Sequence, residues 1–389
     1  MWQVAVVCCV AAAAIAAPSG EHSALSKEDL CAIDIDHSKY ALNLINVAKN
    51  VSSAPRILCL VNTMSVHHNT RVQAIRDTWG QRCAKLLFFS NATDATTPDI
   101  VQLDTQADHN HLWQKHKHTL QYAWDHHRFD GFDWFYKSDD DAYVIVENLQ
   151  AFLRLPEVVM RQDVVPLTFG HRYKLTPDLV DYYVVNKTLL AQFKQLTHNR
   201  WVFNSGGPGY AMNPLYVQTV VESLHRTTCL SDKYCEMLPD DAAISFCMVW
   251  HNVYPSNTRD LSHRERWHAD KPRGISRTER TKVVRWRELR ECMVGVYFTD
   301  VTTPSYWLVQ YHDGIGGAAR HDACCSPDSV AFHYVLPPLM YHMERQLYYC
   351  RSDGDKDLAA FNTRTGLAIS SEILKPTRLA VEYGPVPDV

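Results

Sequence analysis

The sequence lacks several patterns that mark well-defined protein classes. No run of lysine or arginine exceeds a few residues and the formal net charge is −4, which argues against nucleic acid as a partner. The cysteines lack the paired Cys-x-x-Cys spacing of structural zinc sites, and no internal repeat is visible. The 389 residues, 46% hydrophobic and 21% charged, have ordinary globular composition and could form one large domain or two small ones.

The N-terminus carries an apolar stretch that is short for a membrane span. Residues Trp2 to Ala17 are at or below the ~17 to 25 residues that a bilayer requires. Small residues before Pro18 resemble a signal peptide, although the usual basic segment is missing, and an uncleaved signal-anchor is nearly as well supported. Either interpretation predicts that the rest of the chain enters the secretory lumen.

Glycosylation signals and cysteines favour the same compartment. Asn50, Asn91 and Asn186 each begin an Asn-x-Ser/Thr triplet, the acceptor sequence for N-linked sugar. Removing Cys8 and Cys9 with the leader leaves ten of the 12 cysteines. An even number in an oxidising compartment predicts disulfides.

Alternating strand and helix patterns follow a polar segment, residues 18–54, that reads as a stem or linker. Strands are predicted at residues 56–61, 85–89 and 134–138, and helices at residues 71–79 and 111–127. This order is typical of an α/β sheet with crossover helices. In such sheets ligands bind beyond the carboxyl ends of the strands.

Three consecutive carboxylates, Asp139, Asp140 and Asp141, lie at one predicted strand end. Adjacent anions repel one another, so a cation or water must compensate their charge. Mg²⁺ and Mn²⁺ take oxygen ligands and commonly bridge carboxylates to substrate phosphates. The strand end is therefore a candidate metal site, with a solvated acidic turn as the alternative.

Three further features carry candidate chemistry. The glycine-rich loop Ser205 to Met212 matches neither a Walker motif nor the dinucleotide fingerprint; it could admit a ligand close to its backbone or be a plain turn. Asp240 and Asp241 open a predicted helix, either as cap residues or with one of them as a general base. His268 is a candidate third metal ligand, although a solitary histidine is more often structural.

Five segments, in this order, resemble the β1,3-glycosyltransferase family that includes the fringe enzymes, and within it the core 1 branch. They are Arg76 to Trp79, FDWFYKSDDDAYVIVENL (residues 132–149), NSGGPGYAM (residues 204–212), PDDAAI (residues 239–244) and CCSPDSVAFHYV (residues 324–335). The resemblance covers residues 56–351. Each motif is modest, but the ordered set is specific.

The resemblance implies a GT-A fold of the α/β class, a mixed and mostly parallel sheet flanked by helices. The implied organisation is a leader at residues 1–17, a stem at 18–54, a single catalytic domain at 55–352 and a tail at 353–389. It also implies Mn²⁺ and a UDP-sugar, with inverting transfer of galactose from UDP-galactose to the 3-hydroxyl of GalNAc on serine or threonine. The implied location is the Golgi lumen, as a type II membrane protein, or secreted if the leader is cleaved.

Roles carry over from the family position by position. The metal is assigned to Asp139, Asp141 and His268, with His333 in reserve because Trp267 replaces a family phenylalanine. Asp241 matches the catalytic base. The donor is assigned to Thr63, Arg76, Lys115, Asp140, Gly206 and Gly207, and the acceptor to Asp240, Tyr306 and Trp307. Position and resemblance also predict disulfides between Cys59 and Cys83 and between Cys229 and Cys247.

Other functions stay open at this point. A relative with another UDP-sugar or acceptor is the nearest alternative, followed by an inactive sugar-binding or chaperone-like relative, against which the intact Asp139, Asp141 and Asp241 argue. A lectin-like or hydrolytic carbohydrate protein is a further one. The expected partners are a UDP-sugar and a GalNAc-bearing glycoprotein or glycopeptide, with membrane contact only through an uncleaved leader and homodimerisation left open.

Overall fold

A computed structural model describes most of the chain between the stem and residue 351. The described residues are 26–35, 38–93, 97–106, 111–175, 180–181, 183–198, 200–226, 228–229, 239–272, 325–351 and 361. Two of the expectations above, Tyr306 and Trp307 as acceptor residues, lie outside these residues, as do the leader and nearly all of the tail.

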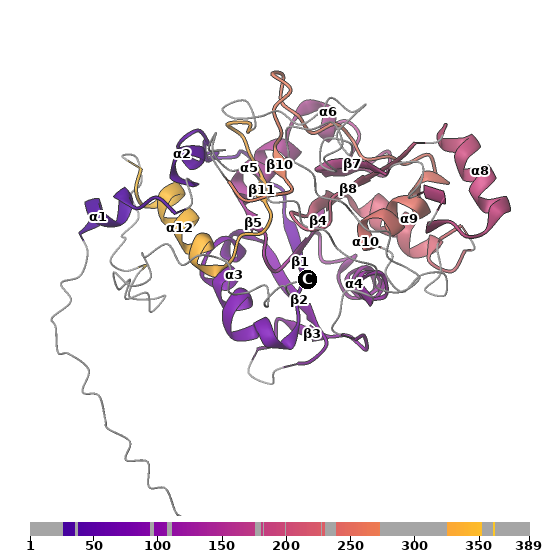
Figure 1. Cartoon of the computed structure of the whole chain (residues 1–389), viewed down its shortest axis with the longest axis horizontal. Helices are drawn as coiled ribbons and strands as arrows, with labels where there is room; N and C mark the ends of the chain where they lie inside the picture. Colours follow the sequence, from indigo (N-terminus) through magenta and orange to yellow (C-terminus); the bar gives the residue numbers. More distant parts are fainter. Residues whose placement is uncertain are drawn as a thin grey trace, which may run out of the picture.

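A six-stranded sheet forms the centre of the molecule (Figure 1). Its strands, in spatial order, are β3 (Ile100–Gln102), β2 (Lys85–Ser90), β1 (Ile57–Asn62), β4 (Trp134–Asp139), β9 (Tyr210–Met212) and β6 (Thr168–Gly170). The first four run parallel, and β9 is antiparallel to both β4 and β6. The predicted mixed, mostly parallel sheet flanked by helices is therefore confirmed.

Strand β1 shows why the sheet is buried on both faces. All six of its residues are buried, as expected of a central parallel strand covered by helices on either side. Because side chains alternate along a strand, Ile57, Cys59 and Val61 enter one hydrophobic core while Leu58 and Leu60 enter the other. The sheet thus separates two cores.

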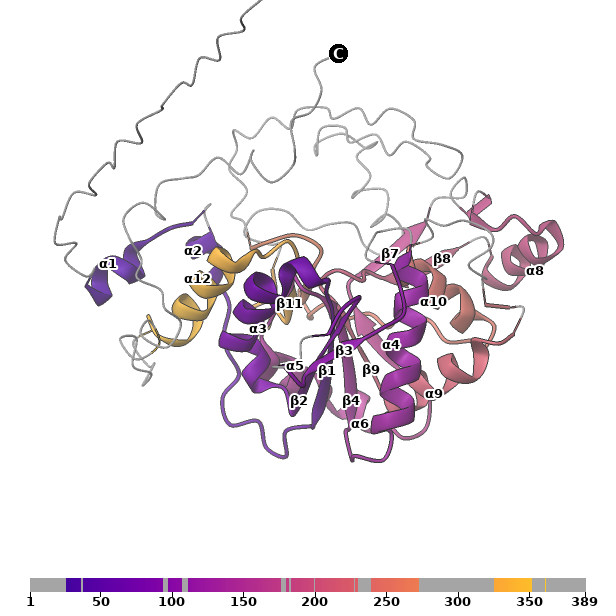
Figure 2. The ribbon, with the colours of Figure 1, turned by 90° about the horizontal axis from the view of Figure 1, so that it is seen from below.

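Two sets of helices cover the two faces, as the view in Figure 2 makes clear. One core holds side chains of α2 (Ser38–Asn43), α3 (Gln73–Asp77), α5 (Val146–Leu153), α6 (Pro156–Val159) and α12 (Pro337–Tyr348). The other holds those of α4 (Leu112–His127), α8 (Lys187–Thr197), α9 (Pro214–Ser223) and α10 (Asp240–Val249). Short helical turns η1 (Ser65–His67), η2 (His68–Val72) and η3 (Trp79–Arg82) lie on either side of α3 in sequence.

Two smaller sheets stand beside the central one. Strands β10 (Trp267–His268), β11 (Ala331–Phe332) and β5 (Tyr143–Val144) form the first, and β7 (Arg172–Leu175) pairs with β8 (Trp201–Asn204) in the second. The first sheet brings the segment after β4 next to residues almost 190 positions later, since Phe332 pairs with Tyr143. Its place beside the end of β4 matters for the site.

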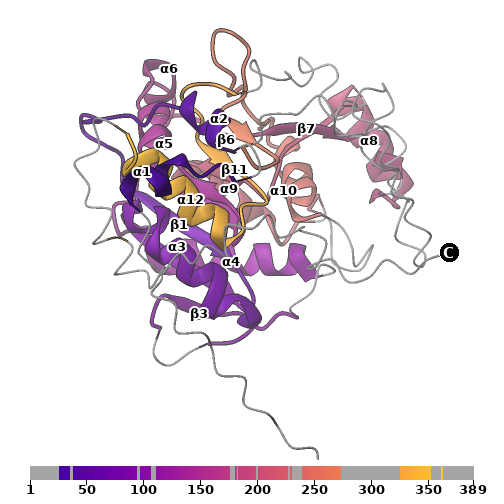
Figure 3. The same cartoon turned by 60° about the vertical axis from the view of Figure 1, so that its left-hand side comes forward.

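Three disulfides tie the described segments together. Cys59–Cys83 and Cys229–Cys247 are both present, which confirms the two predicted pairs. A third, Cys31–Cys350, joins α1 (Lys27–Ala32) to the second residue after α12, and Figure 3 shows these helices side by side. Part of the segment expected to be a stem is thus fastened to the folded domain.

Among the described residues, no helix has the length and apolar character that a membrane span requires.

Candidate active site

The carboxyl ends of β1 and β4 meet at one edge of the central sheet. Asn62 is paired with Asp139 in the register of the two strands, so the acidic triplet begins where both strands end. The Asp139 carbonyl then accepts a hydrogen bond from the Ala142 amide, which turns the chain back toward β5. The triplet therefore sits where open α/β sheets bind their ligands.

Two of the three aspartates share a site with a histidine. One ligand atom each from Asp139, Asp141 and His333 lies within 4.8 Å of the others, and His333 Nε2 is 3.2 Å from Asp141 Oδ1. All three side chains are partly solvent-accessible. Two carboxylates and an imidazole suit a divalent ion such as Mn²⁺, so this cluster could hold one.

Gly207 makes room for the histidine of this cluster. A Cβ atom at Gly207 would lie 2.1 Å from Cε1 of His333, a distance that no real contact allows. The Gly207 carbonyl also accepts a hydrogen bond from the Asp139 amide, at 3.3 Å. The second glycine of the loop is therefore needed because the imidazole packs directly against the backbone.

His268, the expected third ligand, is not part of this cluster. Its Nε2 lies 2.9 Å from Ser329 Oγ, its ring stacks on Phe332 at 4.4 Å, and burial lowers its pKa to about 3. These contacts are those of a neutral histidine inside the small sheet. The structure therefore brings His333 and not His268 to the two carboxylates.

Asp140 points away from the cluster into a set of hydrogen-bond donors. Thr63 Oγ1 donates to its Oδ2 at 2.6 Å, His67 Nδ1 lies 2.8 Å from the same oxygen, and Arg71 donates to Oδ1 at 2.8 Å. Burial would raise the pKa of Asp140, but His67 and Arg71 outweigh it and hold the pKa below its usual range. Its carboxylate is thus occupied by the protein itself, which differs from the expected contact with a donor.

The arginine expected at the donor is engaged elsewhere. Arg76 forms a bidentate ion pair with Asp99, in which Nη2 donates to Oδ1 at 2.6 Å and Nε donates to Oδ2 at 2.8 Å. Arg71, one π-helical turn earlier, instead reaches Asp140 and lies 3.7 Å from Asp141. Arg71 is therefore a cation in contact with the acidic triplet, at Asp140 and Asp141, and sequence reasoning missed it.

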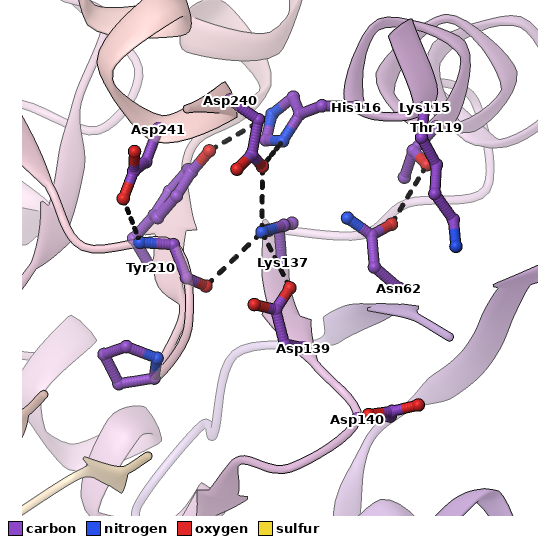
Figure 4. Close-up of polar contacts among 12 residues, drawn as sticks. Asn62, Lys115, His116, Thr119, Lys137, Asp139, Asp140, Tyr210, Asp240 and Asp241 are labelled. Carbon is purple, nitrogen blue, oxygen red and sulfur yellow. Dashed lines mark hydrogen bonds and ion pairs between the residues drawn. The ribbon is translucent and has the colours of Figure 1, made fainter. Parts of the chain in front are cut away.

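Lys115 and Asn62 line the same edge of the sheet (Figure 4). Lys115 comes from α4 and donates to the backbone carbonyl of Thr63. Burial lowers the pKa of Lys115 to about 8, although Asp139 and Asp140 oppose the shift. Asn62 accepts from Thr119 at 3.3 Å, while its own Nδ2 is buried with no hydrogen-bond partner among the described residues. Unpaired polar groups of this kind are available to a ligand.

A buried lysine connects the metal cluster to the first helical turn of α10. Lys137 on β4 is 1% exposed, and its Nζ lies 3.1 Å from Asp139 Oδ1, 3.0 Å from Asp240 Oδ2 and 3.4 Å from the Gly206 carbonyl. Burial alone would lower the pKa of Lys137, but the two carboxylates raise it, so the ammonium is retained.

Asp240, expected to contact the acceptor, is buried and belongs to this network. Its Oδ2 also lies 2.8 Å from His116 Nδ1, and His116 Nε2 is 3.1 Å from the Tyr210 hydroxyl. Burial lowers the pKa of His116 and raises that of Tyr210, so Tyr210 donates to a neutral imidazole that donates to Asp240. Burial would raise the pKa of Asp240, but Lys137 and His116 outweigh it and keep Asp240 ionised.

Asp241 differs from its neighbour because no cation among the described residues forms an ion pair with it. Its carboxylate accepts hydrogen bonds from the Gly206 amide at 2.9 Å and the Ala242 amide at 2.8 Å. Burial and the negative charge of Asp240 raise the pKa of Asp241 to about 7. A partly accessible carboxylate with a pKa near neutrality is suited to accept a proton from a ligand.

Comparisons with known proteins show the family of the chain. Residues 52–279 match the model of the Fringe-like family. The chain is also 25% identical, over 87% of its length and 80% of the relative's, to a glycoprotein-N-acetylgalactosamine 3-beta-galactosyltransferase 1 of Xenopus laevis. The strand-end carboxylates, the glycine loop and the start of α10 all lie inside the matched residues, and the chain belongs to the Fringe-like family of glycosyltransferases.

Proposed function

We propose that this chain transfers galactose from UDP-galactose to the 3-hydroxyl of GalNAc linked to serine or threonine of glycoproteins, with inversion at the anomeric carbon and with Mn²⁺. The observation that carries the proposal is a metal-ligand cluster that one buried lysine joins to Asp240, the neighbour of a second, chemically distinct carboxylate, Asp241. The relative from Xenopus laevis, named for the same acceptor sugar and linkage, supports the choice of substrates.

We assign the metal to Asp139, Asp141 and His333. Their two carboxylates and one imidazole are the donor set that Mn²⁺ accepts in proteins. An ion held by these three residues would supply positive charge to offset the negative charge that develops on the departing UDP. On this assignment, His268 supports the small sheet in which it lies.

We assign the donor to the edge of the sheet around Asn62. Thr63, Lys115, Gly206 and Gly207 keep the donor-side role expected of them, because Lys115 brings positive charge and the glycine loop lies beside the acidic triplet, where the Gly207 carbonyl accepts from the Asp139 amide. Asp140 and Arg76 take indirect roles, since their charged groups are held by other side chains. Arg71 joins the donor side as a cation beside the acidic triplet.

In the proposed reaction Asp241 accepts the proton of the acceptor 3-hydroxyl. The freed oxygen attacks the anomeric carbon of galactose from the face opposite the diphosphate. A carbon–oxygen bond forms to the acceptor while the bond to the diphosphate breaks, and its electron pair leaves with UDP. This single displacement converts an α-linked donor into a β-linked product, and the proton remains on Asp241 until it passes to water.

The rate should depend on pH through Asp241. The active form of a general base is the carboxylate, and the pKa of Asp241 lies at about 7. We therefore expect kcat/KM for the acceptor to fall about tenfold per pH unit below pH 7 and to level off above it. Initial rates between pH 5.5 and 8.5 at saturating metal would measure this; a limb near pH 4 would mean that another group takes the proton.

We place the reaction in the secretory lumen. Cys31–Cys350, Cys59–Cys83 and Cys229–Cys247 are disulfides, which form and persist in oxidising compartments. All three Asn-x-Ser/Thr triplets begin at exposed or half-buried positions outside helices and strands, at Asn50, Asn91 and Asn186, where a sugar can be attached.

A donor screen tests the proposal directly. The full chain is incubated with a GalNAc-α-O-peptide, Mn²⁺ and either UDP-galactose, UDP-glucose, UDP-N-acetylglucosamine or UDP-N-acetylgalactosamine, and the linkage of the product is read by NMR. We expect transfer from UDP-galactose alone, a β1,3 linkage, and loss of transfer in EDTA. Preference for another donor would assign the chain to another substrate, and metal-dependent UDP binding without any transfer would indicate an inactive relative.

A further inference from the structure

The buried cation Lys137 has no role in the proposed chemistry so far, yet it contacts three segments that the reaction must hold together. Its Nζ reaches Asp139 at the end of β4, the carbonyl of Gly206 in the glycine loop, and Asp240 at the start of α10. Figure 4 shows these contacts radiating from Lys137. An ammonium has three N–H groups, so these three acceptors use its full hydrogen-bonding capacity.

Each contact leads to a group in the proposed site. Asp139 is a ligand in the metal cluster. Gly206 donates its amide to Asp241 and offers its carbonyl to Lys137, so the residue is held from both ends. Asp240 immediately precedes Asp241 in α10. Lys137 thus connects Asp139 with Asp241 in two ways, through Gly206 and through Asp240.

The packing around Gly206 is tight, so the contacts that connect Lys137 with Asp241 have little room to move. A Cβ atom there would lie 3.2 Å from Lys137 Nζ and 3.3 Å from Asp241 Cβ, closer than most real contacts. Lys137 itself is 1% exposed. Asp240 is further held by His116, a fully buried residue of α4 that also contacts Tyr210 of β9. The ammonium therefore occupies a fixed position.

We propose that Lys137 is a positioning residue of the transfer reaction, which sets the separation of the metal carboxylate and the base and compensates the charge of Asp240 beside that base. The inference rests on the proposed function, because it takes Asp241 as the base. Among the described residues, the charged and titratable groups that act on Asp241 are Asp240 within α10, Lys137 from β4 and Tyr210 from β9, and the Gly206 and Ala242 amides donate to it. Lys137 is the one cation among these groups.

The proposal predicts opposite changes from two substitutions. In Lys137→Met, Asp241 loses the nearby positive charge, so the acidic limb of the pH–rate profile should move up by about one unit, with kcat lowered on the order of 100-fold. In Asp240→Asn, Asp241 loses the adjacent negative charge, so the limb should move down by a similar amount. The double variant should return the limb to within about 0.5 unit of the wild type.

The test measures these limbs in the full chain at saturating Mn²⁺, with Lys85→Met as the control. Lys85 lies on β2 in register with Leu58, away from the strand end that carries Asp139, and its loss should leave the limb unchanged. As a readout without turnover, the carboxyl pKa of Asp241 is taken from ¹³C NMR in metal-free protein, using Asp241→Asn to assign the signal. It should move in the same directions as the limbs.

Shifts in the same direction for the two single variants, or no shift, would overturn the proposal and leave Lys137 as a support of the fold. Lys137→Met leaves two carboxylates without their counter-charge, so it could fail to fold. In that case Asp240→Asn, which removes a charge and keeps the size of the side chain, tests by itself whether neighbouring charges set the pKa of Asp241. An acidic limb at the wild-type pH in this variant would overturn the proposal. If the wild type transfers no sugar, the proposed function fails instead, while the NMR comparison still tests the charge linkage.

Discussion

Replacing Asp241 with asparagine is expected to reduce kcat at pH 7.5 by about 100-fold to 10⁴-fold, the range of effects seen when a general base is lost. The asparagine oxygen can still accept a hydrogen bond from Gly206 or Ala242, so the start of α10 keeps its place. It cannot take a proton from the acceptor hydroxyl. Radiolabelled transfer from UDP-galactose measures kcat, and calorimetry should show unchanged affinity for UDP and Mn²⁺.

The same substitution should also stabilise the protein, which separates lost chemistry from lost folding. The pKa of Asp241 is raised to about 7 in the folded chain, against about 3.9 for an unfolded aspartate. The folded state therefore binds more protons than the unfolded state between these values, and stability falls as pH rises from about 4 to 7. An uncharged asparagine avoids this cost. Because Asp241 is partly solvent-accessible, we expect a gain on the order of 1 to 3 kcal/mol at pH 8.

A matched control is Asp125→Asn on the exposed side of α4. Its carboxylate is 50% exposed and faces Arg128, so neither kcat nor the free energy of unfolding should change appreciably. If Asp241→Asn kept more than a tenth of wild-type kcat with the β1,3 product, Asp241 would not be the base. If it lost stability in chemical denaturation at pH 8, the charge argument for the first turn of α10 would be wrong.

The fold could be predicted because its signals are local. Buried strands such as Ile57–Asn62 and the amphipathic helix Leu112–His127 follow each other in the order of a parallel α/β sheet, and the structure has them in that order. The smaller sheets were not predicted. Strands of two residues such as Trp267–His268 have too few positions to show a period, and their pairing partners lie far away in sequence.

The site was predictable only where single residues match a motif. Asp139, Asp141 and Asp241 are in this group, and the structure sets them at a strand end and a helix start. Lys137 was missed, although a lysine inside an otherwise buried strand is itself a signal, because burying an ammonium requires anions nearby. The sequence indicates that a buried Lys137 needs an anionic partner. It does not indicate that the partner is Asp240, which lies 103 residues later in the chain.

The arginines and the glycines show two other limits of prediction from the sequence. The spacing of Arg71 and Arg76 was read as one regular helix, but residues His68 to Val72 form a π-helical turn. The extra residue in such a turn changes which side chains share a face, so periodicity could not tell which arginine meets the acidic triplet. Likewise, the adjacent glycines suggested a close approach, yet only the structure shows that His333 approaches Gly207.

The position of His333 in the cluster with Asp139 and Asp141 follows from strand register. His268 is paired with Phe332 in the parallel pair of β10 and β11, and the two rings stack. His333 is the next residue after Phe332. Because successive side chains of an extended chain point to opposite faces, the His333 side chain points to the face opposite Phe332. That face is where Asp141 lies, 3.2 Å from His333 Nε2. A motif match alone cannot distinguish the two faces.

We therefore expect His333→Ala to weaken metal-dependent binding of UDP by on the order of 100-fold, while His268→Ala leaves it nearly unchanged. Loss of one of three protein ligands weakens the hold on the ion. His268, by contrast, gives up a hydrogen bond to Ser329 and its stacking on Phe332, so its removal should lower the melting temperature. Calorimetric titration of UDP with and without Mn²⁺ measures the first effect, and thermal unfolding measures the second.

Gly207→Ala tests the same geometry without removing a ligand. The added methyl group would lie 2.1 Å from Cε1 of His333, so the ring must move away from Asp141. We expect Gly207→Ala to weaken Mn²⁺-dependent UDP binding as His333→Ala does, and the double variant to be no weaker than either, because both changes remove one interaction. Additive losses would mean that Gly207 contacts the donor independently, and an effect of His268→Ala on the metal dependence would return the ligand role to His268.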